Sequence, residues 1–148
     1  MIKNLTVFAH KGIKINKKNV HRAVSYLETA LNFRIEFLQF NFIDSDQILE
    51  INRKYLKHNF TTDIITFNYS GNLEILDGEI FISTEDARYN AEKFNVDFNQ
   101  ELLRLIIHGI LHMIGYEDDI PERKKKMKYL ENKYVKELTE AEVKFDIV

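Results

Sequence analysis

The stretch LLRLIIHGILHMIG, residues 102–115, constrains the fold more than any other part of the chain. It is apolar nearly all round at helical spacing, so it predicts a helix buried at the centre of a domain. Two histidines, His108 and His112, lie inside it at a spacing that places both rings on one helix face, about 6 Å apart. Each buried ring nitrogen needs a partner. One divalent metal would serve both rings.

The apolar run ends at a glycine, and three acids follow it closely. Gly115 predicts a left-handed stop for the helix, after which the chain can turn back on itself. Glu117, Asp118 or Asp119 can then reach the point where the two rings meet. Two histidines and one carboxylate with an open position form a known catalytic zinc arrangement. Spacing alone does not choose among the acids, and it also fits two core histidines bonded to backbone carbonyls or water.

The residue after the first histidine is a glycine, which limits the chemistry. Zinc peptidases with the motif H-E-x-x-H carry their general base at that position, and Gly109 supplies none. A glycine inside a helix also costs about 1 kcal/mol relative to alanine. Gly109 therefore indicates either a close approach of substrate to the helix or tight packing against a neighbouring strand.

Composition excludes several classes of protein. The chain has no cysteine, so disulfides, cysteine-based zinc sites and cysteine nucleophiles are absent. Its net charge of −2 argues against a protein that coats nucleic acid through bulk charge, while leaving room for a local basic patch. No apolar run reaches the roughly 20 residues that span a bilayer. We expect a cytoplasmic protein with no membrane partner and one metallohydrolase-like domain over residues 1–148.

Periodicity and capping signals predict an α+β (mixed α/β) domain with helices packed on a mixed sheet of about four strands. Its centre would be the buried helix that carries the metal site. Strands are expected at residues 2–10, 34–43, 63–69 and 79–83, with a turn-containing link over 70–78. Helices are expected at 16–32, after Asp44 or Ser45, at 83–94, at 98–114 behind an Asp97–Gln100 capping box, and at 121–138.

The sequence around the two histidines resembles that of a known family. The segment HGILHMIGYEDD, residues 108–119, is similar to the YbeY endoribonuclease signature H-G-x-L-H-L-x-G-Y-D-H. Upstream, NRKY (52–55) with TTDIITF (61–67) resembles the family's N-x-x-Y and P-T-N-V-L-S-F segments, and GEIFIS (78–83) resembles its G-D-I-x-I-S strand. The similarity extends from about residue 48 to residue 138 and is far more specific than two histidines four apart.

The resemblance implies a function and a set of ligands. The third histidine of the family motif falls on Asp118, so the implied zinc ligands are His108, His112 and Asp118, with one zinc per chain. The implied activity is hydrolysis of single-stranded RNA in ribosomal RNA maturation and ribosome quality control. Implied partners are ribosomal RNA, the small ribosomal subunit and its assembly factors, not DNA. The only catalytic group expected is the water that the metal would hold; no side chain is expected to act as a catalyst.

Two departures from the family pattern affect this interpretation. Asp118 adds negative charge where the family has a histidine, which weakens the metal as a Lewis acid and raises the pKa of water on it. The family's arginine after the tyrosine falls on Leu56. Lys57 and His58 are adjacent and are candidates to replace it, although His58 also fits a solvated loop residue.

Further RNA contacts are expected from two other places. Thr62 and Ser83 are candidates through the family strands alone. Arg123 and Lys124 begin the run RKKKMK, residues 123–128, which either binds phosphates or forms a solvated helix face.

Two other functions compete with the nuclease. One is a zinc-stabilised ribosome-assembly or RNA-binding factor that does not cut. The other is a non-haem iron oxygenase, which also uses two histidines and a carboxylate but usually on a strand-rich barrel.

Overall fold

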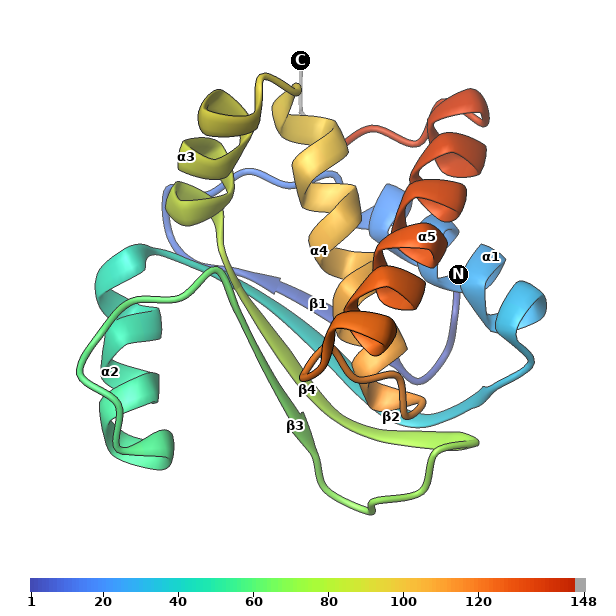
Figure 1. Cartoon of the computed structure of the whole chain (residues 1–148), viewed down its shortest axis with the longest axis horizontal. Coiled ribbons are helices and arrows are strands. Elements are labelled where there is room, and N and C mark those ends of the chain that lie inside the picture. The colour runs from blue at the N-terminus through green and yellow to red at the C-terminus, as the bar shows by residue number, and fades with distance from the viewer. Residues whose placement is uncertain (146–148) are drawn as a thin grey trace.

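The structure is a computed structural model that describes residues 1–145. Within that range the chain forms four strands, which make one sheet, and five helices (Figure 1). The strands are β1 (Leu5–Ala9), β2 (Arg34–Ile43), β3 (Ile64–Asn68) and β4 (Ile75–Ser83). The helices are α1 (Lys17–Leu31), α2 (Ser45–Leu56), α3 (Thr84–Phe94), α4 (Phe98–Met113) and α5 (Pro121–Glu140). The expected α+β class and four-stranded sheet are confirmed.

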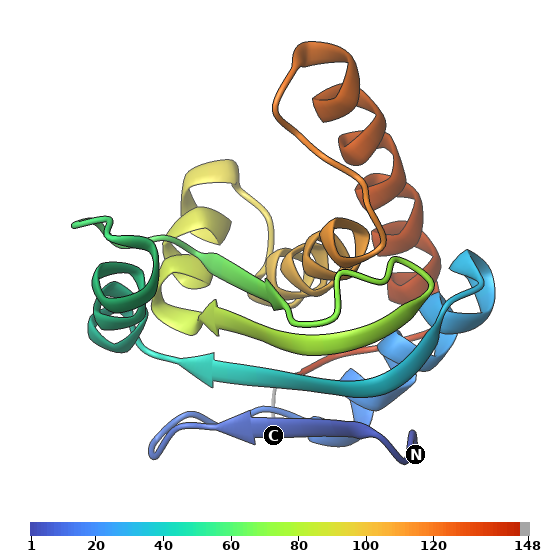
Figure 2. The same cartoon turned by 90° about the horizontal axis from the view of Figure 1, so that it is seen from below.

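The sheet is mixed and has the strand order β1-β2-β4-β3. Strand β1 pairs in parallel with β2, and β2 pairs in parallel with β4, so helices must connect them. Strand β3 pairs with β4 in antiparallel, with Ile64 opposite Ile82 and Asn68 opposite Gly78. Figure 2 shows β3 running opposite to the other three strands, and α2 beyond the arrowheads of β2 and β4.

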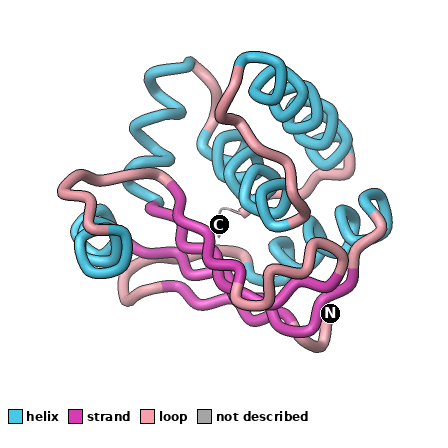
Figure 3. The backbone as a smooth tube through the Cα atoms, turned by 60° about the horizontal axis from the view of Figure 1, so that its bottom comes forward, coloured by secondary structure: helices cyan, strands magenta, loops and turns pink. Residues whose placement is uncertain are grey.

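One face of the sheet carries the main core. Alternate residues of β2, namely Leu38, Phe40 and Phe42, are fully buried on that face, as strand geometry requires. They share one core with the apolar stripe of α1 and with nearly every side of α4. Figure 3 shows α3, α4 and α5 stacked on one side of the sheet. Helix α4 is therefore enclosed between sheet and neighbouring helices, which explains its nearly continuous apolar sequence.

The structure moves one element boundary appreciably. Strand β4 begins at Ile75, four residues before the predicted start, because residues 75–78 continue the ladder instead of forming a link. The predicted link over residues 70–78 is too long because glycine is typical of turns, whereas Gly78 lies inside the strand. A Cβ at Gly78 would stand 2.0 Å from the carbonyl oxygen of Phe67, so the glycine permits close approach of β3.

No helix in residues 1–145 is both long and apolar enough to cross a membrane.

Candidate metal centre

Two local signals fix the ends of α4 and thereby aim its histidines. At the start, the Asp97 side chain accepts a hydrogen bond from the backbone N–H of Gln100 at 2.7 Å, the first of the two bonds of the predicted capping box. At the end, Gly115 takes a positive φ of 103°. Its N–H bonds to the carbonyl of His112 and the N–H of Tyr116 bonds to that of Leu111, the pattern of a Schellman stop.

The loop after this stop brings a carboxylate back to the two rings. Nε2 of His108 lies 3.6 Å from one carboxylate oxygen of Asp118, and Nε2 of His112 lies 3.7 Å from the other. The two ring centroids are 4.5 Å apart. Potential ligand atoms from all three residues lie within 4.8 Å of one another. The structure therefore brings together the three residues that the sequence analysis named as ligands.

This geometry fits a zinc ion. Zinc holds nitrogen and oxygen ligands at about 2.0–2.2 Å in a tetrahedron, which places neighbouring ligand atoms roughly 3.3–3.6 Å apart. The two histidine–aspartate separations are close to that range. Two neutral imidazoles and a carboxylate are ligands that zinc accepts, and three protein ligands leave a fourth position open.

Asp119, the acid next to Asp118, pairs with another residue. Asp119 forms an ion pair with Arg123 at 3.0 Å, on the exposed start of α5. Among the described residues, Asp118 is the acid that joins the two histidines in one candidate group. The structure thus favours the ligand implied by the family resemblance.

A residue without an assigned role in the sequence analysis, Glu131 of α5, fixes the first histidine. Nδ1 of His108 lies 2.6 Å from Oε2 of Glu131, whose side chain is almost fully buried. A carboxylate there stabilises the ring with the proton on Nδ1, which leaves Nε2 free to accept a metal. The other oxygen of Glu131 accepts from Arg104 at 3.2 Å. Carboxylate–histidine pairs of this kind orient metal ligands and make them more basic.

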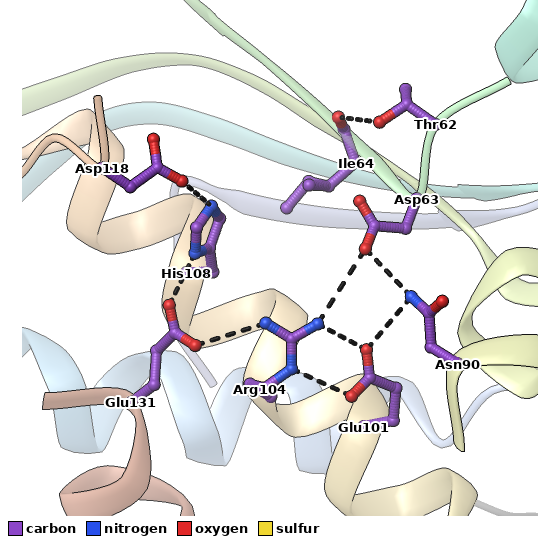
Figure 4. A network of polar contacts seen from close by, with 9 residues as sticks. All are labelled: Thr62, Asp63, Ile64, Asn90, Glu101, Arg104, His108, Asp118 and Glu131. Carbon is purple, nitrogen blue, oxygen red and sulfur yellow. Dashed lines mark hydrogen bonds and ion pairs between the residues drawn. The ribbon is translucent and has the colours of Figure 1, made fainter. Parts of the chain in front are cut away.

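Arg104 extends this pair into a wider network (Figure 4). It donates to both oxygens of Glu101 at 2.9 and 2.5 Å, and it lies 3.9 Å from Asp63 at the start of β3. Asn90 of α3 bridges Asp63 and Glu101. The hydrogen bonds to Glu101 raise the pKa of Arg104, so its guanidinium stays charged. Burial raises the pKa of Asp63, and the positive charge of Arg104 opposes that effect.

The network has more carboxylates than cationic groups. Asp63, Glu101 and Glu131 surround the single guanidinium of Arg104, and Asp118 lies on the far side of His108. Such an excess of acids in a half-buried place favours a nearby cation. A divalent ion between the two histidines and Asp118 would supply that charge.

The glycine between the histidines serves packing. A Cβ at Gly109 would lie 3.1 Å from methyl carbons of Ile64 and Ile80. Helix α4 thus sits directly on β3 and β4 at this point. Of the two interpretations offered above, tight packing against a strand accounts for Gly109, and its face of the helix points to the sheet.

The expected RNA contacts upstream of the centre are scattered. Lys57 and His58 are exposed at the end of α2, where the His58 ring stacks on Phe60 at 5.0 Å. Figure 1 shows α2 separated from α4 by β3 and β4. No hydrogen bond or ion pair within residues 1–145 joins either residue to the three candidate ligands.

Thr62 and Ser83 have contacts within the fold. The hydroxyl of Thr62 donates to the carbonyl of Ile64 at 3.5 Å, beside Asp63 and the polar network. Ser83 is fully buried, accepts from the backbone of Asp86 as the cap of α3, and donates to the Asp86 carboxylate. These bonds give Ser83 a structural role as a helix cap.

The residues of the basic run 123–128 face different sides of helix α5. Arg123 is exposed and paired with Asp119, while Met127 points into the core. Lys124 and Lys128, four residues apart, line a cleft of about 610 Å³ together with His108 and Asp118. The basic run is therefore mostly solvated, as the alternative interpretation held, but two of its lysines border the candidate metal centre.

Comparisons with known proteins identify relatives of this chain. The family model of endoribonuclease YbeY matches residues 5–139. The chain is 41% identical over 127 residues to the endoribonuclease YbeY of Bacteroides fragilis, covering 83% of this chain and 90% of that one. It is 36% identical over 137 residues to that of Chlorobium limicola, covering 93% and 94%.

A solved structure shares the fold. A Thermotoga maritima protein studied in solution matches the fold with a TM-score of 0.65 and 26% identity, covering 90% of this chain and 88% of that one. The family match spans the sheet, α4 with both histidines, the loop with Asp118, and nearly all of α5. On the strength of that match and of curated relatives at this identity and coverage, the chain belongs to the endoribonuclease YbeY family.

Proposed function

We propose that this protein is a zinc-dependent endoribonuclease, with one zinc per chain, that cuts single-stranded ribosomal RNA. It would act in the cytoplasm, in ribosomal RNA maturation and ribosome quality control. Its partners would be ribosomal RNA, the small ribosomal subunit and assembly factors. The observation that supports it best is the convergence of His108, His112 and Asp118 on one point beside an open cleft. The relatives' shared name supports the endoribonuclease activity.

The protein's own groups would divide the work as follows. His108, His112 and Asp118 hold the ion, and Glu131 keeps the His108 ring in the tautomer that presents Nε2. Zinc bound by such ligands polarises a phosphoryl oxygen and lowers the pKa of water. Lys124 and Lys128 at the edge of the cleft would attract the phosphates on either side of the cut. Attack by water and attack by the ribose 2′-hydroxyl are both compatible with this arrangement.

Asp118 and the two lysines of the cleft have opposite effects on the charge that a phosphodiester would meet. The Asp118 carboxylate reduces the net charge of a zinc centre to about +1, so less positive charge faces the RNA than with three histidines. The two lysines restore positive charge at the rim of the same cleft. The cost of replacing a histidine by Asp118 would thus be partly offset by α5.

The experiment is cleavage of a single-stranded ribosomal RNA fragment by zinc-loaded protein, with His112→Ala beside it. His10→Ala, which changes a histidine on the loop after β1, is the matched control. We expect the wild type and the control to cut, and His112→Ala to cut at least about a hundredfold more slowly while it keeps its fold.

The other outcomes separate the competing functions. Equal cleavage by all three proteins would show that the activity comes from a contaminant or another site. Zinc bound at one per chain, with RNA binding but no cleavage, would support the assembly factor. An activity that needs iron and oxygen would support the oxygenase, which family membership already disfavours.

A further inference from the structure

The cleft beside the candidate metal centre runs along the interface of α4 and α5 and changes character along its length. At one end lie His108, Asp118 and the lysines Lys124 and Lys128. The antiparallel course of the two helices places the residues after Glu131 beside the first turns of α4, because Arg104 pairs with Glu131. The far end is therefore lined by Phe94, Val96, Gln100, Asn132 and Val135.

The far end combines apolar walls with free amides. Phe94, Val96 and Val135 supply aromatic and aliphatic surface, and the first two are largely exposed. The side-chain amides of Gln100 and Asn132 also line it, and neither amide has a hydrogen-bond partner among the described residues. A carboxamide offers a donor and an acceptor side by side, which matches the edge of a nucleobase.

We propose that this end of the cleft is a nucleobase subsite, which takes the base of an unpaired nucleotide next to the phosphate held at the metal end. The proposal rests on the function proposed above and adds a specific recognition element to it. Phe94 and the two valines would sandwich the base, and Gln100 and Asn132 would contact its edge. The whole cleft, metal end included, has a volume of about 610 Å³, within the range of small-molecule pockets.

The order of groups along the cleft is what favours a nucleotide. Lys124 and Lys128 lie at the metal end with Asp118, and neutral amides lie at the other end, in the same order as phosphate and base along a nucleotide. The stretch between them is lined by Glu101, Arg104 and Glu131, which are paired with one another. A base in a duplex is stacked and paired, so it would have to be extruded to enter. The subsite would therefore give the protein a preference for unpaired RNA that does not depend on the metal.

The test uses a single-stranded RNA oligonucleotide with one cleavage site and a set of copies with one abasic residue moved along it. In the wild type, removing the base at one position beside the cut should lower kcat/KM at least about fivefold, the lower range for one stacked base. The double change Gln100→Ala with Asn132→Ala, and separately Val135→Trp, should lower cleavage of the intact oligonucleotide similarly. Lys136→Ala, on the exposed side of α5, is the matched control.

Coupling between the two changes is the deciding result. In Val135→Trp the abasic residue at that position should have no further effect, because the base is already kept out of the subsite. In the double amide variant its effect should be smaller than in the wild type, because the edge contacts are lost while stacking remains. Zinc bound per chain should stay at the wild-type level. An abasic scan without any sensitive position would overturn the proposal, as would variants in which the abasic effect persists in full.

A binding measurement tests the subsite even if the protein cuts no RNA. Fluorescence anisotropy of the labelled oligonucleotide and its abasic copies measures affinity without cleavage. If the wild type cuts no RNA, the proposed function fails, yet weaker binding of one abasic copy, abolished in Val135→Trp, would still support the subsite. Equal affinity for all copies would reject it.

Discussion

Replacing Glu131 by glutamine tests how the protein prepares His108 for a metal. The change keeps the size of the side chain but removes its charge. An amide in place of the carboxylate loses the charge-assisted bond to Nδ1 of His108, which spans 2.6 Å, and weakens the 3.2 Å bond from Arg104. The His108 ring then has less reason to keep its proton on Nδ1 and present Nε2 to a metal.

The size of the effect follows from the role of such pairs. Removing an outer partner of a metal-bound histidine lowers metal affinity about 10- to 100-fold, which corresponds to about 1.4–2.7 kcal/mol. The apo protein should lose stability too, because a buried bond to a charged group contributes roughly 1.5–3 kcal/mol. Arg104 keeps its two bonds to Glu101, so the rest of the network should hold.

Zinc affinity is measured by competition with a chromophoric chelator, and stability by urea unfolding of the apo protein. Glu140→Gln, at the exposed end of the same helix, is the control and should match the wild type in both. The visible spectrum of the cobalt-substituted protein reports the ligand geometry directly. Unchanged zinc affinity and an unchanged cobalt spectrum in Glu131→Gln would refute the idea that Glu131 positions His108.

Three other changes test separate parts of the account. Asp118→His, which restores the family's third ligand, should keep zinc binding at one per chain, whereas Asp118→Ala should weaken it at least about tenfold by the same chelator assay. Gly109→Ala should lower the free energy of unfolding by about 1 kcal/mol in urea, because crowding against Ile64 and Ile80 exceeds the gain in helix propensity; a more stable variant would contradict the packing argument. Burial lowers the pKa of His21 from its usual 6.5. Below pH 6.5 the unfolded chain then binds a proton that the folded protein resists, so stability should fall as the pH drops, and His21→Gln should flatten that part of the stability curve.

Much of the candidate site could be predicted from the sequence because its signals are local. A spacing of four residues puts His108 and His112 on one helix face whatever the rest of the chain does. Gly115 marks the end of that helix, and the loop behind it is short. Asp118 could not be chosen by spacing, but the family resemblance pointed to it and the fold places it between the rings.

The supporting residues were harder to predict because their contacts are tertiary. Glu131 lies 23 residues beyond His108 and meets it only because α5 folds back along α4. A partial signal existed: Glu101, Arg104 and His108 form a polar stripe at helical spacing in an otherwise apolar helix. That stripe indicates a polar neighbour on one face, although it does not say which acid comes to meet it.

The remaining differences come from residues that serve more than one purpose. Gly78 signals a turn in the sequence, yet in the sheet it makes room for the backbone of β3. Ser83 belongs to a strand that resembles the family motif, and its hydroxyl is used to cap α3. In both cases a neighbouring segment decides the role, and local pattern cannot supply it.

The central claim is that one zinc ion held by His108, His112 and Asp118 is required for RNA cleavage. The most direct measurement is the initial rate of cleavage of a single-stranded ribosomal RNA fragment during titration of apo protein with zinc, with bound zinc measured in the same samples. The account predicts a rate that rises in proportion to bound zinc and levels off at one ion per chain. In His112→Ala the rate should not rise with added zinc. A rate that is the same in apo and zinc-loaded protein would contradict it.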